Sequence, residues 1–578
     1  MSVSRLGPRT TATALAVASA LVLSGCGGSE PSPEQRFADA LASGDVQAAA
    51  DLTSDPAAAS KAITAMLDGL DAQGRSFTVS ENGDAFTLAA DWSFGEGKQW
   101  QYSTEGRVAG DVIAWDPALL APGLGAGSTV RFTPTSGTPA EVVASDGQPI
   151  MTQQVVTLVN MQPPADTSAL AGLLTPIAPT VTAESLRAEL AKSDGKPVNA
   201  ITLREADIAP VRAQLAAIPG VELVEQTRLL TVDRALSSPV LADLTTVWQE
   251  QQDAAAGWAV QMVNADGTTR RLAGQDAATV PDVDTTLDLR LQTKAEDALA
   301  SVPQPAAIVA LRPSTGAVLA VAQNAPADAQ GAVALTGLYP PGSTFKTVTT
   351  SAALQDGEVT PDTVLPCPGT ENIEGRQIPN DDNFDLGSVP LHSAFAHSCN
   401  TTMGRLAVSL PPDALQQAAL QFGLGVDYMT PGLTTVTGSV PSAESPAERV
   451  ESAIGQGEVT ASPFGMALVA ASIANGSTPA PTMIVGKPGV ADRTVDATPA
   501  DVDAALRSMM RETVTDGTAR ILADIQNLEG KTGTAEYGDG TRPHGWFVGM
   551  NGDLAFAVFV AGADSSGPAL EAAGRFLR

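Results

Sequence analysis

The sequence predicts a multidomain α+β protein whose last domain is of the α/β type. A chain of 578 residues is too long to fold around a single hydrophobic core. Its first part places segments with helical periodicity before aromatic-rich segments that are typical of antiparallel strands. Its last part begins and ends with apolar strand-like segments and carries helical segments between them.

The composition excludes two classes of function. The formal net charge is −31, and a strongly acidic chain repels polyanions, so we expect no nucleic acid partner. Three cysteines and three histidines are too few and too scattered for a Cys/His metal site. We therefore expect neither a metal nor another cofactor.

Residues 1–25 have the features of an export signal. Arg5 and Arg9 precede the apolar run "TATALAVASALVL", which is too short to span a bilayer comfortably. The following "LSGC" resembles the bacterial lipobox, which implies cleavage before Cys26 and lipid on its sulfur. Two or three acyl chains would hold the protein on the extracytoplasmic face of the cell membrane. An ordinary secretory signal that ends near a cysteine is the alternative.

The next two segments are a tether and a small domain. Residues 26–33 are rich in Gly, Ser and Pro and predict a flexible tether, and residues 34–143 predict a cone-shaped α+β domain. We expect one amphipathic helix over 33–53, a second over 60–70, and then antiparallel strands. Such a cone can hold a ligand, but no convergent ionisable residues accompany its aromatics, so we expect these to fill the core. Three tryptophans fall in the strand segments: Trp92, Trp100 and Trp115.

The rest of the chain predicts two further domains. Residues 144–300 mix helical and strand-like segments without a catalytic constellation, which indicates an extended α+β spacer or pedestal, and a capped helix is expected over 285–300. Residues 301–578 are the α/β domain. Two apolar strands over 306–323 surround a tight turn, and two more strands over 544–563 precede a closing helix, so one sheet should join both ends of this domain.

The segment "YPPGSTFKTVTT" carries a serine at a turn-to-helix corner. Ser343 follows a Pro-Pro-Gly turn, and Lys346 comes three residues later in the expected first turn of a helix. Positions i and i+3 share a helical face. The lysine amine can therefore lie beside the serine hydroxyl and activate it as a nucleophile without a histidine.

Two further patterns follow in order along the α/β domain, in an expected helix–helix loop and in a strand that enters the terminal sheet. They are Ser398-Cys399-Asn400 and Lys531-Thr532-Gly533-Thr534. Each pattern alone is weak, because such short matches arise by chance. The order S-x-x-K, S-x-N, K-T-G is much harder to obtain by accident, and it is the motif set of penicillin-binding proteins and serine β-lactamases.

The domain at 301–578 resembles the transpeptidase domain of class B penicillin-binding proteins, with the penicillin-binding/serine β-lactamase-like fold. The flanks "TTLDLRLQTKAEDAL", "IGQGEVTASPFGMA", "DGTA" and "GWFVG" match this family as well. Region 144–300 resembles its dimerisation or pedestal domain, although "EVVASDGQPI" lacks the usual arginine-rich form. The cone resembles the NTF2-like N-terminal extension of the methicillin-resistance penicillin-binding protein. With the lipobox, the chain resembles the actinobacterial penicillin-binding lipoproteins.

The resemblance implies a peptidoglycan D,D-transpeptidase. It would cross-link stem peptides ending in D-Ala-D-Ala through an acyl ester on Ser343, and β-lactams would acylate the same hydroxyl. Lys346 can take the serine proton only when neutral, which burial and the nearby Lys531 favour. Ser398 would relay a proton to the leaving amine, and Asn400 would bind substrate backbone and orient the base.

The third motif would bind and polarise the substrate. The resemblance assigns the oxyanion donors to the backbone N–H groups of Ser343 and Thr534. Gly533 lets the substrate backbone approach the strand closely. The hydroxyls of Thr532 and Thr534, with Lys531, suit a substrate carboxylate.

Two neighbouring features leave alternatives open. Cys367 and Cys399 can pair in an oxidising compartment, but we favour two unpaired thiols. His544 can line the cleft or serve a structural role.

The same motifs occur in rival functions. These are a β-lactam-hydrolysing enzyme or D,D-carboxypeptidase, and a β-lactam sensor or divisome scaffold without turnover. The long N-terminal half argues against a secreted β-lactamase, and residues 401–530 contain no glutamate in the E-x-x-x-N form of a water-activating base. Three intact motifs argue against a scaffold. Divisome or elongation proteins are candidate partners.

Overall fold

The computed structural model describes residues 31–536 and 542–578. The expected signal peptide at 1–25 and the expected lipidation site, Cys26, therefore lie outside the described residues. Within the described ranges, no helix is both long and apolar enough to cross a membrane.

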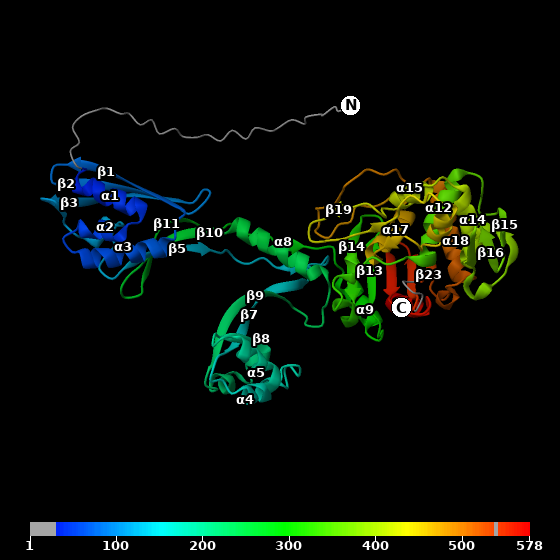
Figure 1. Cartoon of the computed structure of the whole chain (residues 1–578), viewed down its shortest axis with the longest axis horizontal. Helices are drawn as coiled ribbons and strands as arrows, with labels where there is room; N and C mark the ends of the chain where they lie inside the picture. Colours follow the sequence, from blue (N-terminus) through cyan, green and yellow to red (C-terminus); the bar gives the residue numbers. More distant parts are fainter. Residues whose placement is uncertain (1–30, 537–541) are drawn as a thin grey trace, which may run out of the picture. The chain divides into compact units, whose positions relative to one another are not determined.

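Contacts between elements divide the chain into two compact units (Figure 1). The first unit consists of the described residues up to Thr135 together with Ala256–Ala278. The second consists of Ser136–Ala255 together with Thr279–Arg578.

The first unit places three helices against antiparallel strands. Its sheet has the order β1-β2-β3-β4. Its elements are α1 (Pro33–Ser43), α2 (Val46–Asp51), α3 (Pro56–Leu70), β1 (Gly74–Asn82), β2 (Ala85–Ser93), β3 (Gln99–Ala109), β4 (Val112–Ile113), η1 (Pro117–Leu119) and β5 (Thr129–Thr135). Trp92 and Trp100 are buried among its core residues and Trp115 packs at the edge, so the prediction that these aromatics fill the core is confirmed.

The single helix predicted over 33–53 is wrong. Gly44 adopts the left-handed conformation, with φ 79°, and ends α1. Asp45 then caps α2, since its carboxylate accepts a hydrogen bond from the backbone N–H of Ala48 at 3.0 Å. A glycine followed by a capping aspartate is the local signal for one helix ending and another beginning.

A distant segment completes the first unit. The strands β10 (Gly257–Val263) and β11 (Thr269–Gln275) form a three-stranded sheet of order β11-β10-β5. Trp258 and Val260 on β10 join the same hydrophobic core as α1. The predicted boundary at 143 and the continuous pedestal at 144–300 therefore need correction, because this hairpin belongs to the N-terminal unit.

The second unit begins with a sheet around the long strand β7 (Pro149–Met161). This strand pairs with β6, β8 and β9, and four helices cover a small core of their own. The elements are β6 (Val142–Val143), α4 (Thr167–Leu174), α5 (Ala183–Lys192), β8 (Val198–Arg204), α6 (Glu205–Ile208), α7 (Arg212–Ala216), β9 (Val221–Thr231), α8 (Val240–Ala255) and β12 (Val283–Asp284).

A five-stranded antiparallel sheet organises the C-terminal domain. Its order is β14-β13-β25-β24-β23, so strands from both ends of the domain pair with each other, as the sequence predicts. The strands are β13 (Ala306–Arg312), β14 (Ala317–Gln323), β23 (Glu529–Ala535), β24 (His544–Met550) and β25 (Ala555–Val560).

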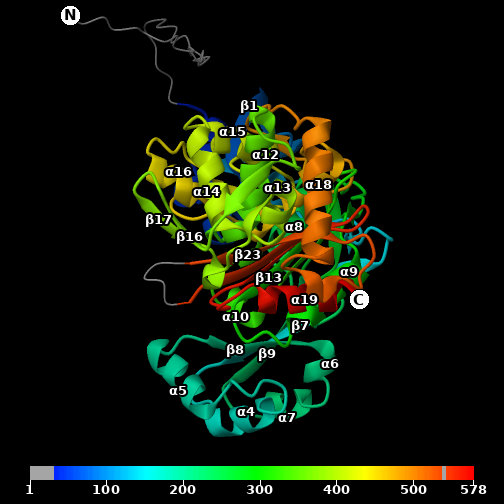
Figure 2. The same cartoon turned by 90° about the vertical axis from the view of Figure 1, so that its right-hand side faces the viewer.

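Both faces of this sheet are covered by helices. On one face, Ile308 and Phe547 pack with α9 (Leu289–Leu299) and α19 (Gly567–Leu577). On the other face, the neighbouring residues Val309 and Trp546 join the main core around the almost fully buried helix α17 (Pro463–Asn475). Successive strand residues point to opposite faces, so strands covered on both sides are apolar throughout. Figure 2 shows α19 and α12 on opposite sides of the sheet.

The remaining elements lie between β14 and β23 in sequence and build the helical part of the domain. They are α10 (Ala325–Asp328), α11 (Val333–Thr336), η2 (Gly342–Phe345), α12 (Lys346–Asp356), β15 (Val364–Cys367), β16 (Thr370–Ile373), β17 (Arg376–Pro379), η3 (Asp381–Asn383), β18 (Gly387–Pro390), α13 (Leu391–Ala396), α14 (Asn400–Ser409), α15 (Ala414–Gln421), β19 (Tyr428–Met429), β20 (Gly438–Ser439), α16 (Pro446–Ala453), β21 (Thr460–Ala461), β22 (Val490–Ala491), α18 (Ala500–Thr515) and η4 (Arg520–Leu522).

Candidate active site

Ser343 lies at the corner between a short 3-10 turn and α12. The turn packs closely on the edge strand β23, because a Cβ atom added to Gly342 would lie 2.5 Å from the carbonyl oxygen of Thr534. Gly342 also has φ 54°, so both the space and the backbone angle require glycine. Ser343 is half-buried at the wall of a cleft, and Lys346 is fully buried one turn further along.

Lys346 donates all of its hydrogen bonds to the second motif. Its Nζ lies 2.7 Å from the carbonyl oxygen of Ser398, 3.1 Å from the Ser398 hydroxyl and 2.6 Å from Oδ1 of Asn400. A neutral amine can donate two hydrogen bonds, one to the carbonyl oxygen and one to the amide oxygen. Its lone pair then remains available to accept a proton from a hydroxyl group.

Ser398 Oγ is shared by two lysines. Besides Lys346, it accepts a hydrogen bond from Nζ of Lys531 at 3.0 Å. Lys531 lies on β23 and donates also to the carbonyl oxygen of Thr532 at 3.1 Å. Ser398 itself has φ 64°, a left-handed conformation that costs energy for a residue with a side chain. This backbone strain is typical of a functional position.

Burial shifts both lysines toward the neutral form. Burial, helped by the positive charge of Lys531, lowers the pKa of Lys346 well below 10.5, and Asp381 opposes this shift. Burial alone lowers the pKa of Lys531 to about 7. An amine that loses its proton readily is available as a general base near neutral pH.

The third motif forms one wall of the cleft. Gly533 is needed for close packing, since an added Cβ atom would lie 2.8 Å from the carbonyl oxygen of Pro341. The hydroxyl of Thr532 lies 2.6 Å from the hydroxyl of Thr518, which comes from the loop after α18. Thr534 lines the cleft beside them. These three hydroxyls make a polar surface that suits a carboxylate.

The cleft has a volume of about 760 Å³. Five of the eight predicted motif residues line it, namely Ser343, Ser398, Asn400, Thr532 and Thr534. The other three, Lys346, Lys531 and Gly533, lie behind this surface. The structure thus brings together all eight residues that the three sequence patterns single out.

Two residues in the cleft wall escaped the sequence analysis. Thr518 belongs to "DGTA", which the family resemblance marks only as a matching flank, and Asn380 belongs to "IPNDD", which carries no motif. Asn380 is 2% exposed and contacts the second motif directly. A polar residue between a proline and two aspartates gives no sequence signal of burial.

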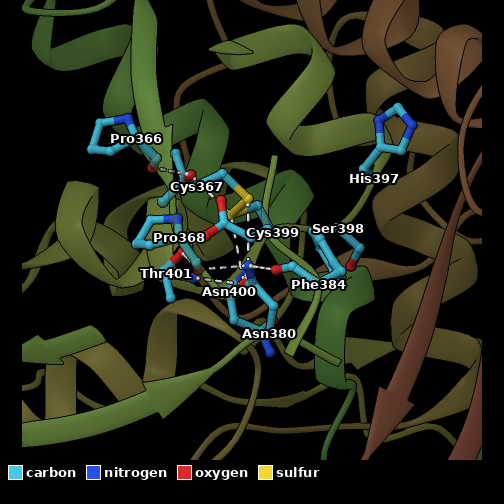
Figure 3. Close-up of a disulfide and its surroundings, with 12 residues drawn as sticks. Pro366, Cys367, Pro368, Asn380, Phe384, His397, Ser398, Cys399, Asn400 and Thr401 are labelled. Carbon is cyan, nitrogen blue, oxygen red and sulfur yellow. Dashed lines mark hydrogen bonds between the residues drawn. A yellow bond between two sulfur atoms is a disulfide. The ribbon is translucent and has the colours of Figure 1, made fainter. Parts of the chain in front are cut away.

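The prediction that Cys367 and Cys399 are unpaired is wrong. The two residues form a disulfide with their Cα atoms 6.1 Å apart (Figure 3). Cys399 lies inside the second motif and Cys367 ends β15, so the bond ties the catalytic loop to the small strands beside it. The sequence does not reveal this pairing, because the distance between two residues that are 32 positions apart in the chain depends on the fold.

His544 has the structural role that the sequence analysis left open. Its ring packs against Tyr339 and Phe559, and its Nδ1 accepts a hydrogen bond from the backbone N–H of Gly562 at 3.0 Å. Burial lowers the pKa of His544, which favours the neutral ring.

Comparisons with known proteins relate the C-terminal domain to a described family. Residues 306–577 match the family described as the penicillin binding protein transpeptidase domain. The chain is 29% identical over 360 residues to the peptidoglycan D,D-transpeptidase PbpA of Mycobacterium tuberculosis, covering 51% of this chain and 71% of that protein. It is 32% identical over 314 residues to PbpA of Mycolicibacterium smegmatis, covering 46% and 64%.

A solved structure shares the fold over much of the chain. It is the penicillin-binding protein PBP2 of Helicobacter pylori in complex with MreC, with a TM-score of 0.59. The match covers 77% of this chain and 98% of that one, at 18% sequence identity.

The disulfide generates a stability prediction. Replacing both Cys367 and Cys399 by serine should lower the free energy of unfolding by about 3–4 kcal/mol, because the open chain gains loop entropy when it unfolds. Urea unfolding followed by intrinsic fluorescence measures the change. Reductant should destabilise the wild type by a similar amount and leave the double variant unaffected. A double variant as stable as the oxidised wild type would contradict this prediction.

Proposed function

We propose that this chain, a class B penicillin-binding protein whose residues 306–577 belong to the transpeptidase family, cross-links peptidoglycan stem peptides through an acyl ester on Ser343. The observation that carries the proposal is the shared position of Ser398 Oγ, which contacts both buried lysines at the base of the cleft. This arrangement supplies a neutral amine base and a proton relay beside a half-buried serine.

The first half of the reaction forms the ester. Ser343 Oγ attacks the carbonyl carbon of the penultimate D-Ala, and its proton passes to the neutral amine of Lys346. The C–N bond then breaks, and the departing D-Ala amine takes a proton through the hydroxyl of Ser398. The backbone N–H groups of Ser343 and Thr534 are the proposed donors to the oxyanion.

The second half of the reaction transfers the acyl group. An amine of a neighbouring stem peptide attacks the ester carbonyl, and Lys346 accepts the proton that this amine loses. The ester C–O bond breaks, and Ser343 Oγ regains its proton. The hydroxyls of Thr532, Thr534 and Thr518 would hold the terminal carboxylate of the donor peptide, or the carboxylate of a β-lactam.

One part of the cleft wall supports a transpeptidase over a β-lactamase. The carboxylate residues that line the cleft, Asp381, Asp382, Glu536 and Asp564, all lie outside the stretch 401–530. Among the described lining residues, the stretch 401–530 contributes Ile454, Gln456 and Thr518, none of which is a carboxylate. Hydrolysis of the ester needs a base to activate water, and in class A β-lactamases a glutamate from the corresponding stretch supplies it. The acyl ester should therefore persist until an amine arrives.

The location and partners belong to the same proposal. Cys26 as a lipid-bearing residue would hold the chain on the extracytoplasmic face of the cell membrane, next to its peptidoglycan substrate. Proteins of the elongation or division machinery are the proposed partners. The likeness of fold to Helicobacter pylori PBP2, which was solved in complex with MreC, supports an elongation partner.

Ser343→Ala should abolish labelling by a fluorescent penicillin while the unfolding midpoint stays near that of the wild type, because a half-buried hydroxyl contributes little to stability. In the wild type, mass spectrometry should find one adduct, on Ser343, with a half-life of at least many minutes. Turnover of D-Ala-D-Ala donors should require an amine acceptor. Hydrolysis of penicillin at roughly 1 s⁻¹ or faster would make a β-lactamase the better assignment.

The second-order rate constant of acylation should rise with pH and then level off at a plateau. The midpoint of this rise, the acid limb of the profile, should lie well below pH 10.5. The sign follows from the mechanism, since only neutral Lys346 accepts the proton and its pKa is lowered by burial. Lys346→Arg keeps a permanent positive charge and should lose at least about a hundredfold in acylation. Lys487→Arg, at an exposed position, is the matched control and should acylate normally.

Protein expressed in a bacterium with a lipoprotein pathway should carry lipid on Cys26, and Cys26→Ala should remain an unacylated precursor. Mass spectrometry of the N-terminal peptide measures both results. Ser29→Ala, in the tether, should be lipidated like the wild type. Wild-type protein without lipid on Cys26 would leave the ordinary secretory signal as the explanation of this segment.

A further inference from the structure

The helix that follows the second motif lacks a cap of its own. The first N–H groups of α14 have no partner within the helix. The residue at the N-cap position, Cys399, provides no side-chain hydrogen bond, and its sulfur is bonded to Cys367. The preceding residue, Ser398, is held at φ 64°. The geometry of this loop therefore depends on groups outside α14.

Asn380 supplies the missing cap from another segment of the chain. Its Oδ1 accepts hydrogen bonds from the backbone N–H groups of Asn400 at 2.8 Å and Thr401 at 3.2 Å. Its Nδ2 donates to the carbonyl oxygens of Pro368 and Phe384, each at 2.9 Å (Figure 3). A side-chain amide has two acceptor sites and two donor hydrogens, so this buried amide is fully used.

The residue before Asn380 fixes the orientation of the Asn400 amide. Nδ2 of Asn400 donates to the carbonyl oxygen of Pro379 at 2.8 Å, which leaves Oδ1 facing Nζ of Lys346 at 2.6 Å. A flipped amide would place its NH₂ against the lysine and its oxygen against the Pro379 carbonyl. Two facing carbonyl oxygens repel each other, and the NH₂ would occupy the lone pair of the neutral amine that the mechanism needs. Pro379 and Asn380 thus hold both the side chain and the backbone of Asn400.

We infer that Asn380 is a positioning residue for the acylation reaction, since it holds Asn400 and through it the base Lys346. The inference rests on the proposed function for the reaction itself. Asn380 contacts no proposed reacting atom. Its effect on catalysis passes through the loop and the Asn400 amide.

The pH profile of acylation distinguishes positioning from general stability. Charged groups that act on Lys346 are Lys531 on β23 and Asp381 in η3, and neither is altered when Asn380 is replaced. Asn400 Oδ1 accepts a hydrogen bond that favours the ammonium form. If Asn400 moves away, Lys346 loses that acceptor, and the acid limb of the profile shifts to lower pH.

The experiment measures the second-order rate constant of acylation by a fluorescent penicillin from pH 5 to 10, together with the thermal unfolding midpoint. Asn380→Ala should lower the plateau rate by about tenfold to a hundredfold, as small misplacements of catalytic groups do. Its acid limb should move to lower pH. Asn372→Ala is the matched control, because Asn372 caps an exposed turn of the neighbouring β16–β17 hairpin, and it should leave both quantities unchanged.

Asn380→Asp keeps the inference testable if the alanine variant does not fold. The carboxylate still accepts from the N–H groups of Asn400 and Thr401, but its second oxygen faces the carbonyl oxygens of Pro368 and Phe384. The plateau rate should therefore lie below that of the wild type. Its negative charge favours the ammonium form of Lys346, so its acid limb should move to higher pH. Opposite shifts in the two variants support the inference. Where the alanine variant does not fold, a plateau rate of the aspartate variant below that of the wild type, together with an upward shift of its acid limb, supports it.

Two results would overturn the inference while leaving the proposed function intact. One is acylation of Asn380→Ala with the rate constant and limb of the wild type. The other is a smaller labelled fraction in either variant without any change in rate constant or limb, which would indicate a structural role only. A folded wild-type protein that penicillin does not acylate would instead contradict the proposed function, and this inference with it.

Discussion

Two buried lysines share one hydroxyl, and the rest of the catalytic domain has to accommodate that arrangement. Lys346 and Lys531 are both fully buried, and the hydrogen bonds described for their amines go to carbonyl, amide and hydroxyl oxygens. Burial of an ammonium group without a carboxylate partner is costly, so both amines are pushed toward neutrality. The same desolvation that destabilises the charged lysines makes one of them a usable base.

Neutral acceptors have to be placed accurately because each is weaker than a carboxylate. The acceptors for Lys346 come from one loop, at Ser398 and Asn400, and the loop is held by a strained backbone, the disulfide and the Asn380 amide. Lys531 comes from the edge strand of a sheet that is packed on both faces. The rigid sheet and the fastened loop together fix the distance between the two amines.

The sequence predicts the parts of this protein that depend on local patterns. The corner at Ser343 and the strand at Lys531 are recognisable from short motifs, and the apolar strands at both ends of the domain indicate a common sheet. The hairpin at 257–275 was missed because its partner strand, β5, lies more than a hundred residues earlier in the chain. Pairing over such a distance is decided by the shared core.

The same reasoning explains why parts of the site could not be predicted. Cys367, Cys399 and Asn380 act through contacts between segments that approach each other only in the folded domain. In the sequence, the two cysteines are equally compatible with unpaired buried thiols, and Asn380 is equally compatible with an exposed turn. The left-handed conformation of Ser398 is equally invisible in sequence, because serine rarely adopts it without support from its surroundings.

The absence of a carboxylate among the lining residues from 401–530 links this architecture to the fate of the acyl ester. Gln456 occupies the cleft wall there and cannot take a proton from water. An amine attacks an ester without prior deprotonation, and it loses its proton only as the new bond forms. Lys346, which has already released its first proton to the leaving group through Ser398, is then neutral and can accept that second proton. A single amine base thus serves both half-reactions for an amine acceptor, whereas water would need a base of its own in line with the ester.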